Sequence, residues 1–117
     1  MSNLLLMTLA ALATLTACST PHEQIYRDQP LVAKVSTGMS KQQVLDIGGQ
    51  PVAVNKRMEN PGSCLDYQLS QAGQRQAYHV SLDARDKVDH QGFTNCAGWE
   101  LRQQADKERR ENSGGGY

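Results

Sequence analysis

Hydrophobic residues are concentrated at the N-terminus of the chain and form regular patterns further on. The segment from Leu4 to Ala17 contains no charged residue and is built mainly from Leu, Ala, Thr and Met. It is about 14 residues long, whereas a helix that spans a bilayer needs about 20. This length favours the apolar region of a secretory signal peptide over a membrane anchor.

A short helical pattern follows this segment. Pro30 suits the first position of a helix, and Gly38 is suited to end one. The apolar residues between them fall at i, i+1 and i+4, on one side of a helix: Leu31, Val32 and Val35. We therefore predict a short helix that begins at Pro30.

The next helical pattern has clearer ends. Ser40 and Gln43 have the spacing of a capping box, in which each side chain accepts a hydrogen bond from the backbone of the other residue. Gly48 and Gly49 end the pattern, and Pro51 prevents the helix from continuing. The buried side of this second helix is supplied by Val44, Leu45 and Ile47.

Beyond these helices, apolar residues alternate with polar ones, as in half-buried strands. Three segments show this alternation: Cys64–Ser70, Ala77–Leu82 and Val88–Asn95. The polar segments 71–74 and 83–87 indicate tight turns between them. Three strands joined in this way form an antiparallel meander, with one face buried by the helices and the other face open. The predicted fold is α+β: two short N-terminal helices packed on a three-stranded antiparallel meander (α-α-β-β-β).

The sequence changes character after Ala97. It becomes charged and rich in amides, and it ends in three glycines and a tyrosine. Because this part lacks apolar spacing, we expect residues 98–117 to form a flexible, disordered tail. A local helix is compatible with its composition, but nothing in the pattern would hold such a helix to a core. The folded domain is therefore predicted at residues 30–97.

Composition and charge exclude several classes of function. The 117-residue chain has 12 basic and 12 acidic side chains and thus no net charge. Binding of nucleic acid requires a basic face, so this balance argues against it. Removal of residues 1–17 would leave about 100 residues, the size of one small domain.

The apolar run ends at Leu15-Thr16-Ala17-Cys18, which resembles the lipobox of bacterial lipoproteins. In that motif, the signal peptide is cleaved before a cysteine that already carries diacylglycerol. The resemblance implies that residues 1–17 are a signal peptide, that Cys18 is lipidated, and that residues 18–29 form a lipidated tether. The first three residues depart from the usual pattern, because they include no Lys or Arg. The alternative is a buried helix that ends in cysteine by chance.

A lipidated Cys18 would attach the protein to a membrane. Stable anchoring takes more than one acyl chain, and lipoproteins of this kind carry three. In enteric-type bacteria, an Asp after the lipidated cysteine retains the lipoprotein at the inner membrane. The residue at this position is Ser19. We therefore expect a lipid anchor in the outer membrane, with the domain facing the periplasm.

Two cysteines, Cys64 and Cys96, remain once Cys18 carries lipid. An even number of cysteines in a secreted chain is typical of disulfides. A bridge would close a loop of about 32 residues, which corresponds to about 3–4 kcal/mol of stabilisation. The alternative is a metal site that includes His79 or His90, although no CxxC or HxxxH spacing is present. A three-stranded meander would place the cysteines at opposite ends of the sheet unless the third strand ended beside the segment before the first.

The sequence offers little that catalysis could use. His79 falls on the polar side of its strand pattern, where a single histidine is usually solvated or structural. Asp83, Asp86 and Asp89 lack the 1-3-5 spacing and the following Glu of an EF-hand. Ser63 has no evident base, and no nucleophile elbow, zinc-protease motif or P-loop is present. We therefore predict a protein that is not an enzyme and uses no metal, cofactor or small-molecule substrate.

Three motifs in the domain share one resemblance: Gly38-Met39-Ser40-x-x-Gln43-Val44, Gly49-x-Pro51 and Leu65-x-Tyr67. Together they are similar to the signature of the SmpA/OmlA (BamE-like) lipoprotein domain family. Two further segments are similar to those of its osmotically inducible members: Gly62-Ser63-Cys64-x-x-Tyr67 and Thr94-Asn95-Cys96-Ala97. The resemblance covers about residues 35–97. It implies an α-α-β-β-β fold, an anchor on the periplasmic side of the outer membrane and no known catalysis.

Two hypotheses about function follow from this resemblance. In the first, the protein is a structural or homeostatic lipoprotein that supports the cell envelope under osmotic stress. In the second, it is an adaptor that binds an outer-membrane protein assembly partner through the open sheet face or through residues 55–60. Both hypotheses give the protein the outer membrane as a partner, through the lipid on Cys18. The second adds an envelope protein.

Overall fold

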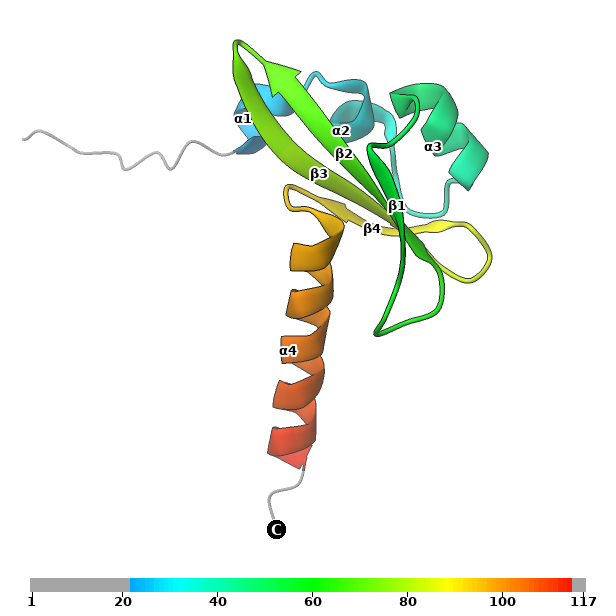
Figure 1. The fold of residues 1–117 in the computed structure, drawn as a ribbon, viewed down its shortest axis with the longest axis vertical. Coiled ribbons are helices and arrows are strands. Elements are labelled where there is room, and N and C mark those ends of the chain that lie inside the picture. Colours follow the sequence, from blue (N-terminus) through cyan, green and yellow to red (C-terminus); the bar gives the residue numbers. More distant parts are fainter. Residues whose placement is uncertain (1–21, 115–117) are drawn as a thin grey trace, which may run out of the picture.

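The structure, a computed structural model, describes residues 22–114, so the predicted signal peptide and Cys18 lie outside the described residues. Within this range the chain forms four helices and four strands. Their bounds are α1 (His22–Tyr26), α2 (Pro30–Lys34), α3 (Lys41–Gly48), β1 (Ala53–Lys56), β2 (Ser63–Gln71), β3 (Gln74–Leu82), β4 (Val88–Gly92) and α4 (Cys96–Gly114). Figure 1 shows α1, α2 and α3 on one side of the sheet and α4 projecting from the other.

The four strands form one antiparallel sheet in the order β1-β2-β3-β4. The predicted turns at residues 71–74 and 83–87 join β2 to β3 and β3 to β4. The first of them has Ala72 and Gly73 at its centre, with φ values of 50° and 78°. Two residues of positive φ match the right-handed twist of a hairpin. The α+β class is as predicted, but the sheet has four strands where we predicted three.

The additional strand is β1, at one edge of the sheet. It pairs with β2 over four positions, from Ala53↔Asp66 to Lys56↔Ser63. All of its side chains are exposed. A strand without a buried face has no need to alternate apolar with polar residues, so a search for periodicity could not find it.

The hydrophobic core lies between the sheet and the first three helices. α3 begins with the predicted capping box: Ser40 Oγ accepts from the Gln43 N–H at 3.2 Å, and Gln43 Oε1 accepts from the Ser40 N–H at 2.8 Å. The alternation predicted for the two central strands sends their apolar side chains to this face. The core comprises Tyr26, Leu31, Val35, Val44, Leu65, Tyr67, Leu69, Tyr78, Val80, Leu82 and Val88.

The core extends further towards the N-terminus than the predicted boundary at Pro30. Tyr26, at the end of α1, is only 2% exposed, and its ring centroid lies 6.3 Å from that of Phe93. A buried aromatic ring fixes the chain on both sides of it. Residues 22–29 are therefore part of the folded domain, whereas we predicted that they belong to a tether at residues 18–29.

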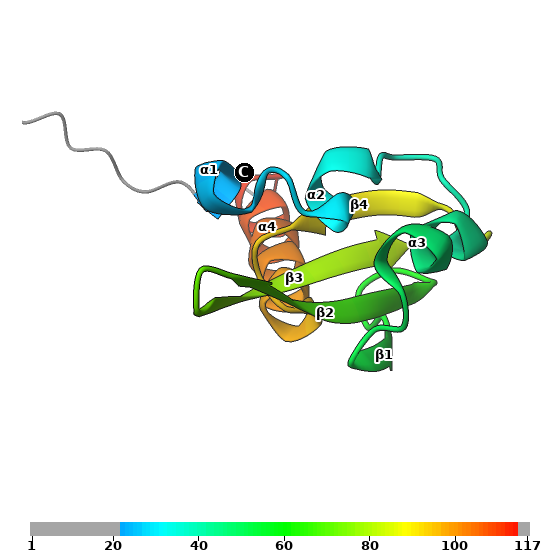
Figure 2. The same ribbon diagram turned by 90° about the horizontal axis from the view of Figure 1, so that it is seen from above.

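The segment predicted as a disordered tail is helical through Gly114. α4 begins at Cys96. The domain boundary that we predicted at residue 97 therefore falls inside this helix. Figure 2 shows the helix nearly end-on, on the side of the sheet away from α2 and α3. Two expectations are thus corrected: residues 98–114 belong to a helix and not to a disordered tail, and the second face of the sheet is partly covered. The physical reason is that α4 is held by polar, aromatic and covalent contacts, which an apolar pattern does not reveal.

Candidate functional site

The end of β4 decides where α4 lies. Its last residue, Gly92, pairs with His79 near the middle of β3. The chain then leaves the sheet and crosses to the face opposite the core. Asn95 starts the helix there, because its side-chain oxygen accepts a hydrogen bond from the Gly98 N–H at 2.7 Å. α4 therefore begins over the middle of the sheet and not beyond its end.

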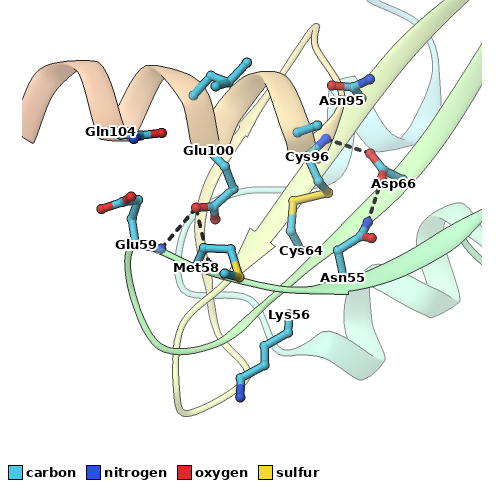
Figure 3. Close-up of a pocket in the computed structure, with 12 residues that line it drawn as sticks. Asn55, Lys56, Met58, Glu59, Cys64, Asp66, Asn95, Cys96, Glu100 and Gln104 are labelled. Carbon is cyan, nitrogen blue, oxygen red and sulfur yellow. Dashed lines mark hydrogen bonds between the residues drawn. A yellow bond between two sulfur atoms is a disulfide. The ribbon is translucent and has the colours of Figure 1, made fainter.

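This path brings Cys64 and Cys96 together. They form a disulfide between β2 and the first turn of α4, with Cα atoms 5.9 Å apart. Asp66 reinforces the junction, since its carboxylate accepts from the Cys96 N–H and from the Asn55 side-chain amide, both at 2.7 Å (Figure 3). The geometric difficulty of the three-stranded meander does not arise, because the last strand stops early.

Three aromatic rings are stacked between the sheet and α4. The Trp99 and His90 ring centroids are 3.6 Å apart with planes 3° from parallel, and His79 lies 5.0 Å from His90. Nδ1 of His79 lies 2.9 Å from the carbonyl oxygen of Thr94, which can only accept. Nδ1 of His79 therefore carries the proton. Its Nε2 then accepts a hydrogen bond from Nδ1 of His90 at 2.9 Å.

Burial sets the charge of both histidines. It lowers the pKa of His79 from 6.5 to about 4, although the hydrogen bond to Thr94 acts in the opposite direction. Burial also lowers the pKa of His90. Both rings are therefore neutral at neutral pH. This state suits the single hydrogen bond between them, because two imidazolium rings would place two N–H donors against each other.

Arg57 is buried at the start of the loop that follows β1, with 5% of its surface exposed. Its guanidinium donates to Asp89 Oδ2 at 2.6 Å and to the Leu82 carbonyl at 3.2 Å. From α4 it is met by Gln103 Oε1 at 3.0 Å and by the Glu100 carboxylate at 3.9 Å. A buried cation requires such partners, so Arg57 ties its loop to both β4 and α4.

A cleft of about 690 Å³ opens between β1, the loop after it and α4 (Figure 3). One wall is fixed by Glu100, whose carboxylate accepts from the Met58 N–H at 3.3 Å and the Glu59 N–H at 3.1 Å. Met58 and Leu101 border the cleft and are 83% and 67% exposed. The lining is completed by Asn55, Lys56, Cys64, Asp66, Asn95, Cys96, Ala97 and Gln104.

The lining of the cleft has the composition of a contact surface. Among residues 22–114 it includes no histidine or serine, the usual base and nucleophile of acyl transfer. Exposed apolar side chains such as Met58 and Leu101 are typical of surfaces that meet a partner. β1 adds an exposed sheet edge beside them, which is where extended peptides add to sheets.

The predicted site residues have different outcomes. Cys18 lies outside the described residues. Cys64 and Cys96 are joined to each other, so their sulfurs are not free to form the alternative metal site with His79 or His90. Within residues 22–114, no group of three or more His, Cys, Asp and Glu side chains is placed to hold a metal ion. No helix in that same range has both the length and the apolar composition needed to cross a membrane.

Sequence reasoning missed the residues that hold α4 in place. Arg57 lies in a polar stretch, and Asp66 occupies a polar position of the predicted strand alternation. Only the folded chain shows that residues of α4 meet both of them, Gln103 at Arg57 and Cys96 at Asp66. Trp99 gave the one signal that could have been used. It is the single tryptophan of the chain, and it stands in an otherwise charged segment. Tryptophan is highly buried on average, so its presence argues that this segment packs against something.

Residues 25–92 match the family described as the outer membrane protein assembly factor BamE domain. The match runs from within α1 to the end of β4 and covers more than half of the chain. The chain therefore belongs to the BamE domain family, as the motifs in its sequence predicted. This family is not known to be enzymatic.

Within this family the chain is similar to the osmotically inducible lipoprotein OsmE. The OsmE proteins of Escherichia coli K12 and O157:H7 are each 32% identical to it over 105 residues, 87% of this chain and 94% of theirs. An OsmE crystal structure is 42% identical, with a TM-score of 0.69 over 71% of this chain and 95% of that chain. α4 lies beyond the BamE family match, which ends at Gly92.

Proposed function

We propose that the protein is a non-catalytic lipoprotein, anchored to the periplasmic side of the outer membrane, that supports the cell envelope under osmotic stress. The observation that carries this proposal is Cys18, which directly follows an apolar run of signal-peptide length in a lipobox. The BamE domain and the similarity to osmotically inducible OsmE support the role in the envelope.

The other two cysteines support the same compartment. Cys64 and Cys96 are bonded to each other and are 1% and 2% exposed. Disulfides of this kind persist in oxidising compartments such as the bacterial periplasm and are rare in the cytosol. Cys18 is thus the cysteine left for attachment of lipid, and Ser19 after it favours the outer membrane over the inner one.

A substitution at Cys18 tests the anchor. The Cys18→Ala variant is expected to incorporate no palmitate, to keep residues 1–17 and to be absent from the outer-membrane fraction, because the thiol that takes the lipid is missing. Metabolic labelling, intact mass and density-gradient fractionation measure these properties. Ser19→Ala serves as a matched control and should fractionate as the unmodified protein does, whereas Ser19→Asp should move it to the inner membrane. Normal fractionation of Cys18→Ala would refute the anchor.

A second function, that of an adaptor for an outer-membrane protein assembly partner, is favoured by the cleft. Its exposed Met58 and Leu101 lie next to β1, the edge strand of the sheet within residues 22–114, in a protein whose family carries the name of an assembly factor. An apolar patch of this kind, bordered by Lys56, Glu59 and Gln104, has the composition of a contact surface with a polar rim.

Crosslinking in intact cells tests the adaptor role. If the cleft binds the partner, the unmodified protein should recover subunits of the barrel-assembly machinery, and Met58→Glu and Leu101→Glu should lose them, since each places a charge in an apolar contact. Val52→Glu is the matched control, because Val52 is 71% exposed but does not line the cleft. Recovery of no such subunit, together with a deletion phenotype only at high osmolarity, would exclude the adaptor and favour the first function.

A further inference from the structure

The N-terminal segment of the described chain is fixed to the sheet. Tyr26 is buried in the core. Three residues later, the side-chain amide of Gln29 donates to the Ser70 carbonyl and to Gln71 Oε1, both at 2.8 Å. The backbone N–H of Gln29 also donates to the carbonyl of Tyr26 at 2.9 Å. The two side-chain contacts of Gln29 attach the segment to the end of β2, where the β2–β3 hairpin turns, and the backbone bond closes a turn within the segment.

Very little chain separates this fixed segment from the proposed lipid anchor. Only three residues lie between Cys18 and His22, where α1 begins. The four Cα–Cα steps from Cys18 to His22 span at most about 14 Å when fully extended. The headgroup layer of one leaflet is about 5–8 Å thick. A lipid on Cys18 would therefore hold α1 within about two headgroup layers of the bilayer, whereas a 12-residue tether would allow about 40 Å.

The cleft lies at the other end of the sheet. Figure 1 shows α1 beside the closed end of the β2–β3 hairpin, and the connection from β1 to β2 at the opposite end. β2 has nine residues, so its two ends are about 27 Å apart. The cleft is lined by Cys64 and Asp66, from the half of β2 that is remote from the hairpin turn.

We propose that α1 and the closed end of the β2–β3 hairpin form a membrane-facing end of the domain, which lies against lipid headgroups and turns the cleft towards the periplasm. This proposal rests on the lipid anchor proposed above. It names the lipid surface as the partner of this end of the molecule, and it leaves the cleft accessible to a protein.

The side chains at this end suit contact with headgroups without insertion. Among the residues whose exposure the structure describes, those exposed here are polar or small and carry two acidic and two basic groups: Glu23, Gln24, Arg27, Asp28, Gln71, Ala72, Gly73, Gln74 and Arg75. No large apolar side chain is among them, so this end does not enter the hydrocarbon layer. Because the charges balance, the contact needs no anionic lipid and should depend little on salt.

Tryptophan fluorescence in vesicles tests the orientation. The chain has one tryptophan, so a Trp99→Phe background allows a single reporter to be placed at either end. The full-length lipidated protein is reconstituted in phosphatidylcholine vesicles with or without a nitroxide-labelled headgroup. Gln74→Trp at the hairpin should lose most of its emission to the nitroxide, whereas Met58→Trp at the cleft should lose little. Both sites are exposed, so neither substitution displaces a packed side chain.

A longer linker provides the matched control. Insertion of about 20 Gly and Ser residues between Thr20 and Pro21 adds about 25 Å of average reach and should largely remove the quenching of Gln74→Trp. Protein that carries palmitate and floats with the vesicles, but shows no quenching of Gln74→Trp or equal quenching of Met58→Trp, would overturn the orientation alone. Protein without palmitate, which stays in solution, would overturn the anchor and the orientation together.

Discussion

At the scale of single residues, the second face of the sheet is unusual because its interior is polar. Arg57 and His79 are as buried as the residues of the hydrophobic core. Each is stable there because of its partners: Asp89, Glu100 and Gln103 for the guanidinium, and Thr94 and His90 for the imidazole. A buried polar group without such partners would cost several kcal/mol, so these contacts specify one arrangement.

His79 makes the stability of the protein sensitive to acid. Its pKa is about 4 in the folded protein, whereas a histidine surrounded by water has a pKa of 6.5, so the unfolded chain binds a proton more readily. Above about pH 6.5 the His79 ring is neutral in both states and does not oppose folding. As the pH falls from 6.5 towards 4, the unfolded chain takes up a proton at His79 that the folded protein does not, so the free energy of unfolding decreases. The change in pKa corresponds to about 3 kcal/mol at most.

We predict that His79→Gln shows a weaker dependence of stability on pH than the unmodified protein. Glutamine can donate to the Thr94 carbonyl but does not titrate, so the loss of up to about 3 kcal/mol between pH 7 and pH 4 should shrink. Urea unfolding at several pH values measures the free energy of unfolding of both proteins. The carboxylates titrate in both and cancel in the comparison. If the free energy of unfolding falls by the same amount between pH 7 and pH 4 in both proteins, His79 is not the group responsible.

At the scale of elements, the two halves of α4 differ: the first half is packed against the domain, and the second half is mostly exposed. In the first two turns of α4, Cys96 and Trp99 contact the sheet, and Glu100 and Gln103 contact Arg57 in the loop after β1. Beyond Gln104 its side chains are mostly exposed, and Lys107 reaches Glu59 only across 3.9 Å at the surface. Surface pairs of this kind contribute about 1 kcal/mol or less, so the second half adds little stability.

Two truncations should therefore differ sharply. Removal of residues 105–117 is expected to change the melting temperature by a few degrees at most. Removal of residues 98–117 keeps the disulfide but takes Trp99, Glu100 and Gln103 away, which leaves Arg57 with fewer partners. A loss of about 2–4 kcal/mol would lower the melting temperature by about 10–20 °C. Thermal unfolding followed by circular dichroism measures both, and equal melting temperatures would contradict the packing of α4.

At the scale of the whole molecule, the parts predicted correctly are those whose signal is local. The capping box of Ser40 and Gln43 begins a helix by contacts within four residues. The alternation that brings Tyr78 and Val80 to one face is likewise readable in a short window. The disulfide between Cys64 and Cys96 was predicted from their number and compartment, without the geometry that makes it feasible.

The parts that escaped prediction depend on contacts between distant segments. Tyr26 looks like one aromatic residue in a polar stretch until Phe93 is brought next to it. β1 has no buried face, and α4 has no apolar stripe, so neither has the pattern by which such elements are recognised. Within the candidate site, Arg57 acquires its role from partners on β4 and α4 that lie 32 and 46 positions away in the sequence.

The pairing of Cys64 with Cys96 has a consequence for how the protein matures. Three cysteines could pair in three ways, and two of those products would trap Cys18. If lipid is attached to Cys18 at the membrane, its thiol is converted to a thioether and both wrong products become impossible. One pairing then remains for the rest of the chain. An oxidant alone is sufficient to complete the molecule, and a disulfide isomerase has nothing to correct.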